Sequence, residues 1–415
     1  MNIDLYSILS YIWKRLPIIL MFINSFIIYR VIVISGLGEI FIKWLMQKSG
    51  NKIVNLLFFI ILSTALMSCF IPNAITILIL LPILKEIDSK IICNKKEKNR
   101  YTTCLTLAAI YGANIGGMGS LTGTPSNLLL IGVIDFYKIS EGNKINFFNW
   151  LIWAMPLVLF FIIIAWLIII LIGLPKNSFN VKINIFNQRH FEISDEKKAG
   201  GFLCMLFIFF WSIDNICSNL IKMFASIESF ICIIYFLVFG YLSFLKPYGK
   251  QKKIVLKPNE LLSEFPKRGI IFLGIFLIFI ILVQTLSLNK KIMKLFIYDF
   301  INETPKFLLL LSIILVVIFL TEIFSNMVVA STFFTLAYQI STSYNIHPLI
   351  LMISVSLAST CAFMTPVATP CNALAFGEMK GTSLLWMISL GFLLNIIGAL
   401  IISFWINLII PLIYL

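Results

Sequence analysis

The chain has 415 residues, of which 60% are hydrophobic and only 12% are charged, and its mean hydropathy is +1.01. Soluble domains carry about 25% charged residues, so the composition excludes a soluble protein and predicts an all-α polytopic membrane protein. The net charge of +14 does not indicate nucleic-acid binding. The basic residues gather in short segments between apolar runs, which is the positive-inside pattern of membrane proteins.

Six apolar runs are close to the ~20 residues that a helix needs to cross a bilayer. In chain order they are Leu16–Ser35, Trp150–Leu174, Gly201–Leu220, Phe230–Leu245, Gly269–Leu288 and Ser383–Leu412. The basic loops Lys85–Arg100, Pro175–Lys198 and Lys246–Arg268 are predicted to be cytoplasmic. Asp135–Asn149 and Ser341–His347 then lie outside, and Asn289–Lys306, with its four lysines, departs from the pattern.

Four longer apolar runs are interrupted, and they form two pairs in the same order. Residues 54–84 contain IPNAIT and residues 102–134 contain TGTPSN; residues 307–340 contain FSNMVV and residues 349–378 contain VATPCN. Interrupted segments at matching places in two halves are typical of secondary transporters built from inverted repeats. The sequence therefore predicts a first repeat in 1–174, a cytoplasmic linker in 175–200 and a second repeat in 201–415.

The interruptions predict a site for small ions. Runs 54–84 and 307–340 suit re-entrant hairpins that turn near Asn73 and Asn326. Runs 102–134 and 349–378 suit helices that unwind in mid-membrane, because proline removes a backbone donor and breaks a helix. Free carbonyl and amide oxygens suit small cations, while helix N-termini attract anions. A sodium ion and an anion can therefore share such a site without a charged side chain.

Less specific interpretations exist for the same polar residues. The asparagines could join helices, and the threonines could satisfy broken backbone. A charge within an apolar run is a functional hypothesis by default, which applies to Arg30, Asp214 and Glu322. Arg30 could instead reach the membrane surface, and Glu322 could be a structural acceptor near a cation site. His190 and His347 are expected to be solvated loop residues, and no stretch carries an enzyme motif.

Three stretches resemble the divalent anion:sodium symporter family, the carriers of dicarboxylates, citrate and sulfate. They are ANIGGMGSLTGTPSNLLLIG at 113–132, TEIFSN at 321–326 and CAFMTPVATPCNALAFG at 361–377. The similarity runs from about Leu20 to the C-terminus. It implies a homodimer in the cytoplasmic (inner) membrane that works by an elevator motion, with sodium as the coupling ion, no other cofactor and no enzymatic activity.

The resemblance also implies a set of ligands. The first sodium would be held by Ser68, Asn73 and the backbone at Gly123. The second would be held by Thr321, Asn326 and the backbone at Ala368. Substrate oxygens would meet Asn73, Thr124, Ser325, Asn326, Thr369 and Pro370.

The chain departs from the family pattern at several points. Ala74 and Met327 stand where the family has threonines that donate to the substrate. A glycine-rich stretch is expected after Phe265-Pro266, but the sequence there reads KRGIIFLGIF. Three spans that precede the first half in the family are also missing. Either the start lies upstream or this copy is reduced. The prediction is sodium-coupled uptake of a divalent anion, a C4-dicarboxylate first and sulfate second. The alternative is a reduced member of the family that acts as a membrane receptor or a passive channel.

Overall fold

A computed structural model describes most of the chain, namely residues 5–50, 52–91, 94–175, 194–220, 224–249, 252–262 and 305–415. Within these ranges the chain is almost entirely helical, with an isolated bridge between Tyr248 and Lys253 and no strand among the described elements. The predicted all-α fold is confirmed. The predicted span Gly269–Leu288, the KRGIIFLGIF stretch, His190 and most of 175–198 and 289–306 lie outside the described residues.

Three of the described helices are long and apolar enough to cross a membrane. They are α7 (Phe147–Ile168, continued by the π-helix η2, Ile169–Gly173), α9 (Phe224–Phe244) and α18 (Leu384–Tyr414). A fourth candidate is a pair bent by 71°, formed by Ile19–Ile34 of α1 (Leu5–Ile34) and Leu37–Trp44 of α2 (Leu37–Gln47). These helices contain the predicted spans 16–35, 150–174, 230–245 and 383–412, except for a residue or two at their ends. The predicted span 201–220 is helical, within α8 (Asp195–Leu220).

The described chain forms two compact units. One contains α1, α8, α9 and the short α10 (Pro258–Leu262), from Met1–Phe41, Asn146–Asn149 and Gln188–Phe265. In it α1 packs against α8 and α9, and the Arg30 guanidinium donates a 2.6 Å hydrogen bond to the Glu260 carbonyl. Asp214 is buried in the same unit, 3.6 Å from the Cys232 thiol. Arg30 and Asp214 thus have partners in the unit that holds none of the interrupted runs.

The other unit contains all four interrupted runs. It is formed by Ile42–Ile145, Trp150–Asn187 and Pro266–Leu415. Its further helices are α3 (Ile53–Ser68), α4 (Asn73–Lys90), α5 (Lys95–Gly117), α6 (Pro125–Phe136), η1 (Ser140–Lys144), α14 (Lys306–Thr321), α15 (Asn326–Ser343), α16 (Pro348–Ala358) and α17 (Pro370–Glu378). Each predicted repeat therefore contributes helices to both units.

Both predicted hairpins turn at equivalent places. The leading helices α3 and α14 have 16 residues each, about 24 Å of helix, which is shorter than the ~30 Å hydrocarbon core of a bilayer. The returning helices begin at Asn73 and Asn326, after N-cap residues with nearly identical backbone angles. Pro72 has φ −50° and ψ 135°, and Ser325 has φ −58° and ψ 136°. The two tips therefore share one local geometry although their sequences differ.

Both predicted helix breaks are present. The first separates α5 from α6, and the second separates α16 from α17. Each second helix begins with a proline at its first turn, where the missing N–H costs nothing. The N-caps Thr124 (φ −138°, ψ 151°) and Thr369 (φ −140°, ψ 155°) match closely. The second break is longer than predicted, because α16 already ends at Ala358.

Glycines allow the first hairpin to approach the first broken helix closely. A β-carbon on Gly112 would lie 2.6 Å from the Ile61 carbonyl oxygen, and one on Gly116 would lie 2.7 Å from the Ala65 α-carbon. Small residues at such spacing let membrane helices pack backbone to backbone. This contact fixes α3 against α5, and so fixes the first tip beside the first break.

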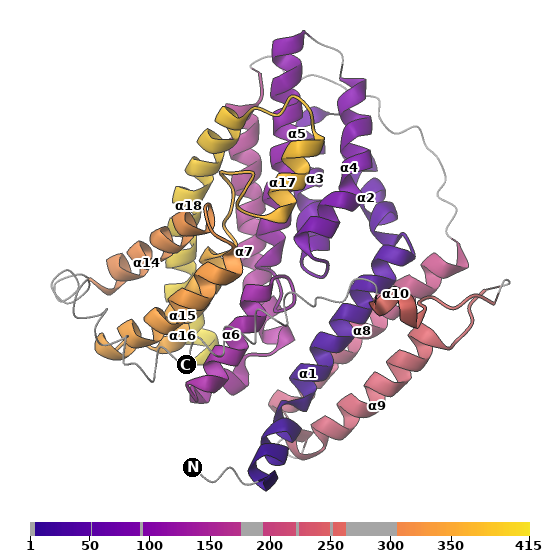
Figure 1. Cartoon of the computed structure of the whole chain (residues 1–415), viewed down its shortest axis with the longest axis vertical. Helices are drawn as coiled ribbons and strands as arrows, with labels where there is room; N and C mark the ends of the chain where they lie inside the picture. The colour runs from indigo at the N-terminus through magenta and orange to yellow at the C-terminus, as the bar shows by residue number, and fades with distance from the viewer. Residues whose placement is uncertain are drawn as a thin grey trace. The chain divides into compact units, whose positions relative to one another are not determined.

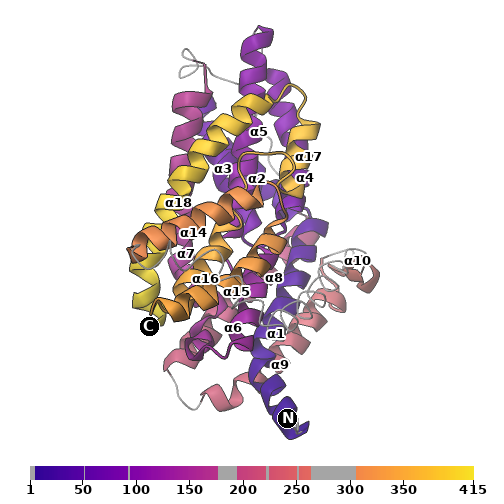
Figure 2. The ribbon, with the colours of Figure 1, turned by 60° about the vertical axis from the view of Figure 1, so that its left-hand side comes forward.

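The hairpin of each half packs against the broken helix of the other half. Figures 1 and 2 show α17 beside α4, and α15 beside α6, and both pairs are in contact. The four helices start at Asn73, Pro125, Asn326 and Pro370, the residues that mark the two tips and the two breaks. Helix starts from both halves are therefore gathered in one unit.

Two segments predicted as loops are more ordered than expected. The basic stretch 85–100 is largely helical, because α4 continues to Lys90 and α5 already begins at Lys95. The Asp88 carboxylate lies 3.2 Å from Lys98, which ties the two helix ends together. His347 is not simply solvated: its Nδ1 accepts from the Leu349 N–H as the N-cap of α16, and its Nε2 lies 3.2 Å from the Glu141 carboxylate.

Candidate functional site

The first tip brings two of the predicted ligands together. The Ser68 hydroxyl donates a 2.5 Å hydrogen bond to Asn73 Oδ1. The Asn73 amide nitrogen donates to Asn114 Oδ1 on α5 over 3.3 Å. Ser68 is buried and Asn73 is half-buried, so the tip offers oxygen ligands at the boundary of the protein interior.

The first break lies directly beside this tip. A β-carbon on Gly117 would lie 2.6 Å from the Thr124 methyl carbon and 3.5 Å from both amide atoms of Asn73. One on Gly123 would lie 2.5 Å from the Gly117 carbonyl oxygen. Only glycines allow this approach, and it places Asn73, Gly123 and Thr124 around one point.

The Thr124 hydroxyl is the clearest sign of a ligand position there. Thr124 is only 6% exposed, and its Oγ1 has no hydrogen-bond partner among the described residues. A buried polar group left unpaired typically costs ~1–3 kcal/mol. A substrate that forms a hydrogen bond with this hydroxyl would remove that cost. The unpaired hydroxyl therefore marks a position where a substrate could bind.

The second tip repeats the arrangement of the first. The Thr321 hydroxyl lies 2.7 Å from Asn326 Oδ1 and 2.9 Å from the Ser359 carbonyl oxygen. Thr321 and Asn326 are separated by five positions, as Ser68 and Asn73 are. Ser325 is exposed at the tip, and its side chain is open to a ligand.

The second break is held by Glu322. Its carboxylate accepts hydrogen bonds from the backbone N–H groups of Phe363, Met364 and Thr365 at 2.7, 2.8 and 2.9 Å. Asn395 on α18 donates a fourth at 2.8 Å. The buried charge is therefore compensated by four donors, and the unwound backbone from 363 to 365 is held in one position.

One further contact of Glu322 has a counterpart in the first half. The Thr365 hydroxyl donates to the Glu322 carbonyl over 2.7 Å, and the Ser120 hydroxyl donates to the Cys69 carbonyl. Cys69 thus occupies in the first half the place of Glu322 in the second. The two halves share the backbone contact and differ in the carboxylate.

The asparagines of the two TPxN motifs close the breaks. Asn127 Nδ2 donates to the carbonyls of Gly117 and Ser120 at 3.1 and 2.7 Å. Asn372 Nδ2 donates to the carbonyls of Ala362 and Thr365, both at 2.9 Å. In each half the acceptors lie ten and seven positions before the asparagine. The sequence motif identified the repeat, whereas this role depends on the fold.

Ala368, Thr369 and Pro370 form the start of α17. Ala368 and Thr369 are buried and Pro370 is exposed. The Thr369 hydroxyl accepts a 3.2 Å hydrogen bond from the Asn372 N–H, which caps the helix. The connection from this start to the second tip runs through Asn372, Thr365 and Glu322, which the predicted ligand set did not include.

Asn114 is one of the residues of the site that sequence reasoning missed. It is fully buried on α5 and bonds to both the first tip and the second break. An asparagine among small and apolar residues in a membrane helix was the available signal, since such amides often join helices. Its partners lie 41 and 258 positions away in the chain, so the sequence alone does not identify them.

The chemistry of the site suits a monovalent hard cation and an anion. Its oxygens come from hydroxyls, amides and carbonyls, which hard cations prefer. The described residues contain no group of three or more His, Cys, Asp or Glu that could hold a metal ion. The helix starts at Asn73, Pro125, Asn326 and Pro370 direct backbone N–H groups and positive dipole ends outward, which attracts anions.

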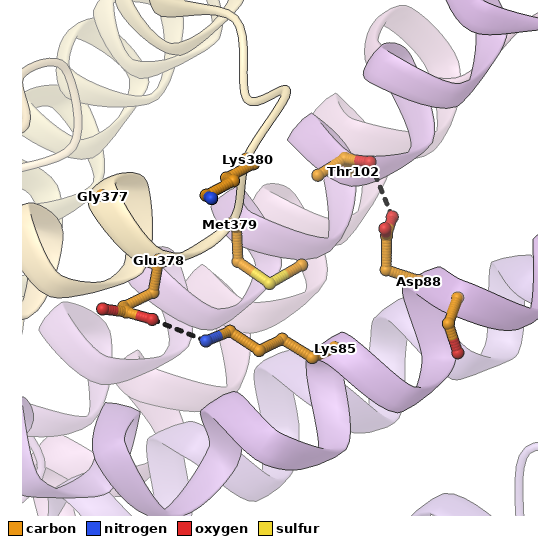
Figure 3. A pocket seen from close by; sticks show the side chains of 8 residues that line it. Lys85, Asp88, Thr102, Gly377, Glu378, Met379 and Lys380 are labelled. Carbon is orange, nitrogen blue, oxygen red and sulfur yellow. Dashed lines mark hydrogen bonds and ion pairs between the residues drawn. The ribbon is translucent and has the colours of Figure 1, made fainter.

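A separate pocket of about 530 Å³ lies at the far ends of α4 and α17 (Figure 3). Its lining includes the ion pair between Lys85 and Glu378, at 2.5 Å, and the hydrogen bond from Thr102 to Asp88, at 2.6 Å. Its lining is mixed in charge and contains none of the predicted ligands. The pocket lies between the C-terminal ends of the two helices, whereas the site residues Asn73 and Pro370 lie at their N-terminal ends. It is therefore not the candidate site.

The comparisons with known proteins agree with this geometry. Residues 14–415 match the family model for the sodium:sulfate symporter transmembrane region. The chain is 26% identical over 394 residues to a sodium-dependent dicarboxylate transporter of Staphylococcus saprophyticus, covering 87% of this chain and 70% of the relative. It is 27% identical over 384 residues to the transporter of that name from Staphylococcus aureus, covering 88% of this chain and 71% of the relative.

The chain therefore belongs to the sodium:sulfate symporter family, which is the divalent anion:sodium symporter family predicted from the sequence motifs. It is a multi-pass protein of the plasma membrane and a sodium-coupled symporter of divalent anions. The prediction that it is a transporter and not an enzyme is confirmed by the family match.

Proposed function

We propose that the protein couples the inward movement of sodium to the uptake of a C4-dicarboxylate such as succinate, malate or fumarate. The observation that carries this proposal is the repeated tip. Ser68 with Asn73, and Thr321 with Asn326, place a hydroxyl and an amide oxygen together at equivalent points of the two halves. Each pair lies beside one of the two helix breaks. In this proposal each pair holds sodium through neutral oxygens, without a charged side chain as ligand.

The first sodium in this proposal binds between the first tip and the first break. Ser68 and Asn73 supply side-chain oxygens, and the backbone at Gly123 supplies a carbonyl. The close approach of Gly117 to Asn73 and Thr124 supports this set. When sodium binds, the Ser68 hydroxyl turns its proton away from Asn73 so that both oxygens can face the ion.

The second sodium in this proposal binds between the second tip and the second break. Thr321 and Asn326 supply side-chain oxygens, and the backbone at Ala368 supplies a carbonyl. Glu322 supports this set without touching the ion, because its carboxylate already accepts four hydrogen bonds. It keeps the unwound segment in position and adds negative potential near the ion.

The substrate in this proposal lies between the two sodium ions. Its carboxylate oxygens accept hydrogen bonds from the two tip asparagines and from hydroxyls at the tips and breaks. The unpartnered Thr124 hydroxyl supports this arrangement. The set is Asn73, Thr124, Ser325, Asn326, Thr369 and the helix start at Pro370. The two sodium ions then neutralise the charge of the dianion. Binding of the substrate and binding of sodium therefore depend on each other.

Transport in this proposal is an elevator motion of a homodimer built from inverted repeats. Two observations support it: all four interrupted runs fall in one compact unit, and the tips and breaks repeat in geometry between the two halves. Movement of the unit with its bound ions would alternate access without rebuilding the site.

A C4-dicarboxylate is preferred over sulfate because two related proteins are named sodium-dependent dicarboxylate transporters. Ala74 and Met327 lack the hydroxyls that the family offers to the substrate. The remaining donors at the tips and breaks are sufficient for two carboxylates, at reduced affinity. Sulfate is the second candidate, supported by the description of the family model.

The test is uptake of labelled succinate into proteoliposomes that contain the purified protein. Uptake should require external sodium and fall to the level of empty liposomes in choline at the same pH. Unlabelled fumarate and malate should compete more strongly than sulfate. Stronger competition by sulfate would reassign the substrate, while equal uptake in sodium and choline would exclude sodium coupling. Sodium-dependent binding without uptake would favour the receptor alternative.

A further inference from the structure

We infer that Asn114 is the positioning residue that joins the two sodium sites, so that occupation of one favours occupation of the other. The inference rests on the proposed function and concerns a residue outside its ligand set. Asn114 lies on α5 and is fully buried. Its side-chain hydrogen bonds with the described residues go to the first tip and the second break, which come from different halves of the chain.

The two ends of the Asn114 amide face opposite partners. Its Oδ1 accepts from Asn73 Nδ2 at 3.3 Å and from the Cys371 thiol at 3.4 Å. Its Nδ2 donates to Asn372 Oδ1 at 3.0 Å and to the Ala362 carbonyl at 2.8 Å. Reversing the amide would set its NH₂ against that of Asn73 and its oxygen against two oxygens. One orientation of Asn114 is therefore enforced.

This orientation is passed to both sites. Because Asn73 must donate through Nδ2 to Asn114, its Oδ1 is held toward Ser68 and the proposed first sodium. Because Asn372 must accept through Oδ1 from Asn114, its Nδ2 is held toward the carbonyls of Ala362 and Thr365. Thr365 is in turn fixed by Glu322, the residue next to Thr321.

One continuous chain of hydrogen bonds therefore connects the tips. It runs Ser68, Asn73, Asn114, Asn372, Thr365 and Glu322. In a low-dielectric interior, linked hydrogen bonds polarise and orient one another. When sodium orders Asn73 at the first tip, Asn114 and the second break are ordered too. The second ion then binds to a site that has already been ordered.

The chain offers a matched control on the same helix. Thr106 lies on α5 two turns before Asn114, is fully buried, and shares a 2.9 Å hydrogen bond with Thr382 of the other half. It therefore also joins the two halves, but it does not contact a tip or break. Replacing Thr106 by valine removes a buried hydrogen bond between the two halves without changing a tip or a break. It tests whether loss of such a bond is enough to change the sodium response.

The experiment measures the thermal unfolding midpoint of the detergent-purified full chain as a function of sodium chloride, with choline chloride keeping ionic strength constant. A ligand that binds the folded state raises the midpoint, and this readout needs no transport. The wild-type midpoint should stay nearly constant at low sodium and then rise sharply with the logarithm of the sodium concentration, because the two ions bind together. Absence of any sodium response in the wild type would overturn the proposed function and this inference together.

In Asn114→Leu and Asn114→Asp the sodium concentration at which the midpoint begins to rise should increase by about tenfold, and the onset of the rise should become more gradual. Thr106→Val should keep the wild-type concentration and shape. The aspartate variant has a further signature: its carboxylate repels Asn372 Oδ1 at neutral pH, and protonation restores a donor. Its sodium response should therefore recover between about pH 7.5 and about pH 5.5, and that of Asn114→Leu should not.

Two results would overturn the inference while leaving the proposed function in place. One is a wild-type sodium concentration and curve shape in both Asn114 variants. The other is that both Asn114 variants and Asn372→Asp fail to fold while Thr106→Val folds normally. Asn114 would then have a structural role only. If only Asn114→Leu fails to fold, Asn114→Asp decides the question, since it conserves the size of the side chain.

Discussion

Asn395 of α18 donates a 2.8 Å hydrogen bond to the carboxylate of Glu322, which lies 73 positions earlier in the chain. Nearby on α18, Gly391 lies so close to the unwound segment that a β-carbon would be 2.7 Å from the Met364 α-carbon. The long C-terminal helix and the glutamate thus hold the second break from two sides.

Glu322→Gln should lower both the thermal stability and the sodium affinity of the protein. The amide has one acceptor oxygen where the carboxylate has two, and its NH₂ would face a backbone N–H. Leaving buried donors unpaired costs ~1–3 kcal/mol each. The measurement is the unfolding midpoint in detergent with and without sodium. A variant that matches the wild type in both conditions would contradict the role given to the carboxylate.

Asn73→Ala and Asn326→Ala should each abolish succinate uptake while the protein still reaches the membrane. Each removes an amide oxygen from a proposed sodium site and a donor from the proposed substrate site. Ser389→Ala is a suitable control, because its exposed hydroxyl bonds only to the Leu385 carbonyl of its own helix. Near-normal uptake by both asparagine variants would show that the tips are structural only.

Ala74→Thr combined with Met327→Thr should tighten succinate binding. A hydrogen bond to a charged group contributes ~1.5–3 kcal/mol, so each restored hydroxyl should lower the half-saturating concentration by about one to two decades. The measurement is the succinate dependence of uptake in proteoliposomes. Weaker uptake of the native anion would show that Met327 fits a smaller or less polar substrate. An unchanged value would place both positions away from the substrate.

Gly116→Ala should prevent correct assembly, whereas Gly132→Ala should not. A β-carbon at position 116 would overlap the backbone of α3 at Ala65, while one at position 132 meets no atom within 4 Å. Both glycines lie inside helices, where alanine is otherwise favoured by ~0.5–1 kcal/mol. Monodisperse protein recovered in detergent is the measurement. Equal yields from the two variants would disprove the close contact between α3 and α5.

The contact between Glu141 and His347 should make a pH-dependent contribution to stability. The Ser140 hydroxyl and, more weakly, the nearby imidazole hold the pKa of Glu141 below its usual range. A carboxyl group with a depressed pKa stabilises the fold above its unfolded pKa, about 4.3 for glutamate, and the effect is lost as the pH falls through its folded value.

Wild type should therefore unfold at a higher temperature than Glu141→Gln near neutral pH, and the two should converge below about pH 4. The effect should be small, because both side chains are about a quarter to a third exposed and salt screens such pairs. A difference between the two proteins that grows as the pH falls below about 4 would contradict the sign assigned to the Glu141 carboxyl.

The sequence identified the tips and breaks because proline and asparagine are poor choices inside an apolar run. Asn73, Asn326, Thr124 and Thr369 were found in this way, and the helix boundaries agree with them. Asn114 and Asn395 could not be assigned, since each sits within a continuous helix and its partners lie far away in the chain. Long-range pairing of single polar residues leaves no periodic pattern in a sequence.

The exchange of partners between the two halves has a consequence for synthesis in the cell. Helix α4 is complete at Lys90, but its packing partner α17 begins at Pro370. Ribosomes add about 5–20 residues per second, so α4 waits roughly 15–60 s in the membrane for α17. During that interval α4 can pack against α5, but the face that α17 later covers has no partner, and Lys85 lacks the Glu378 carboxylate with which it pairs. A chain that stops before Pro370 therefore leaves this face of α4 without the helix that covers it in the complete second unit.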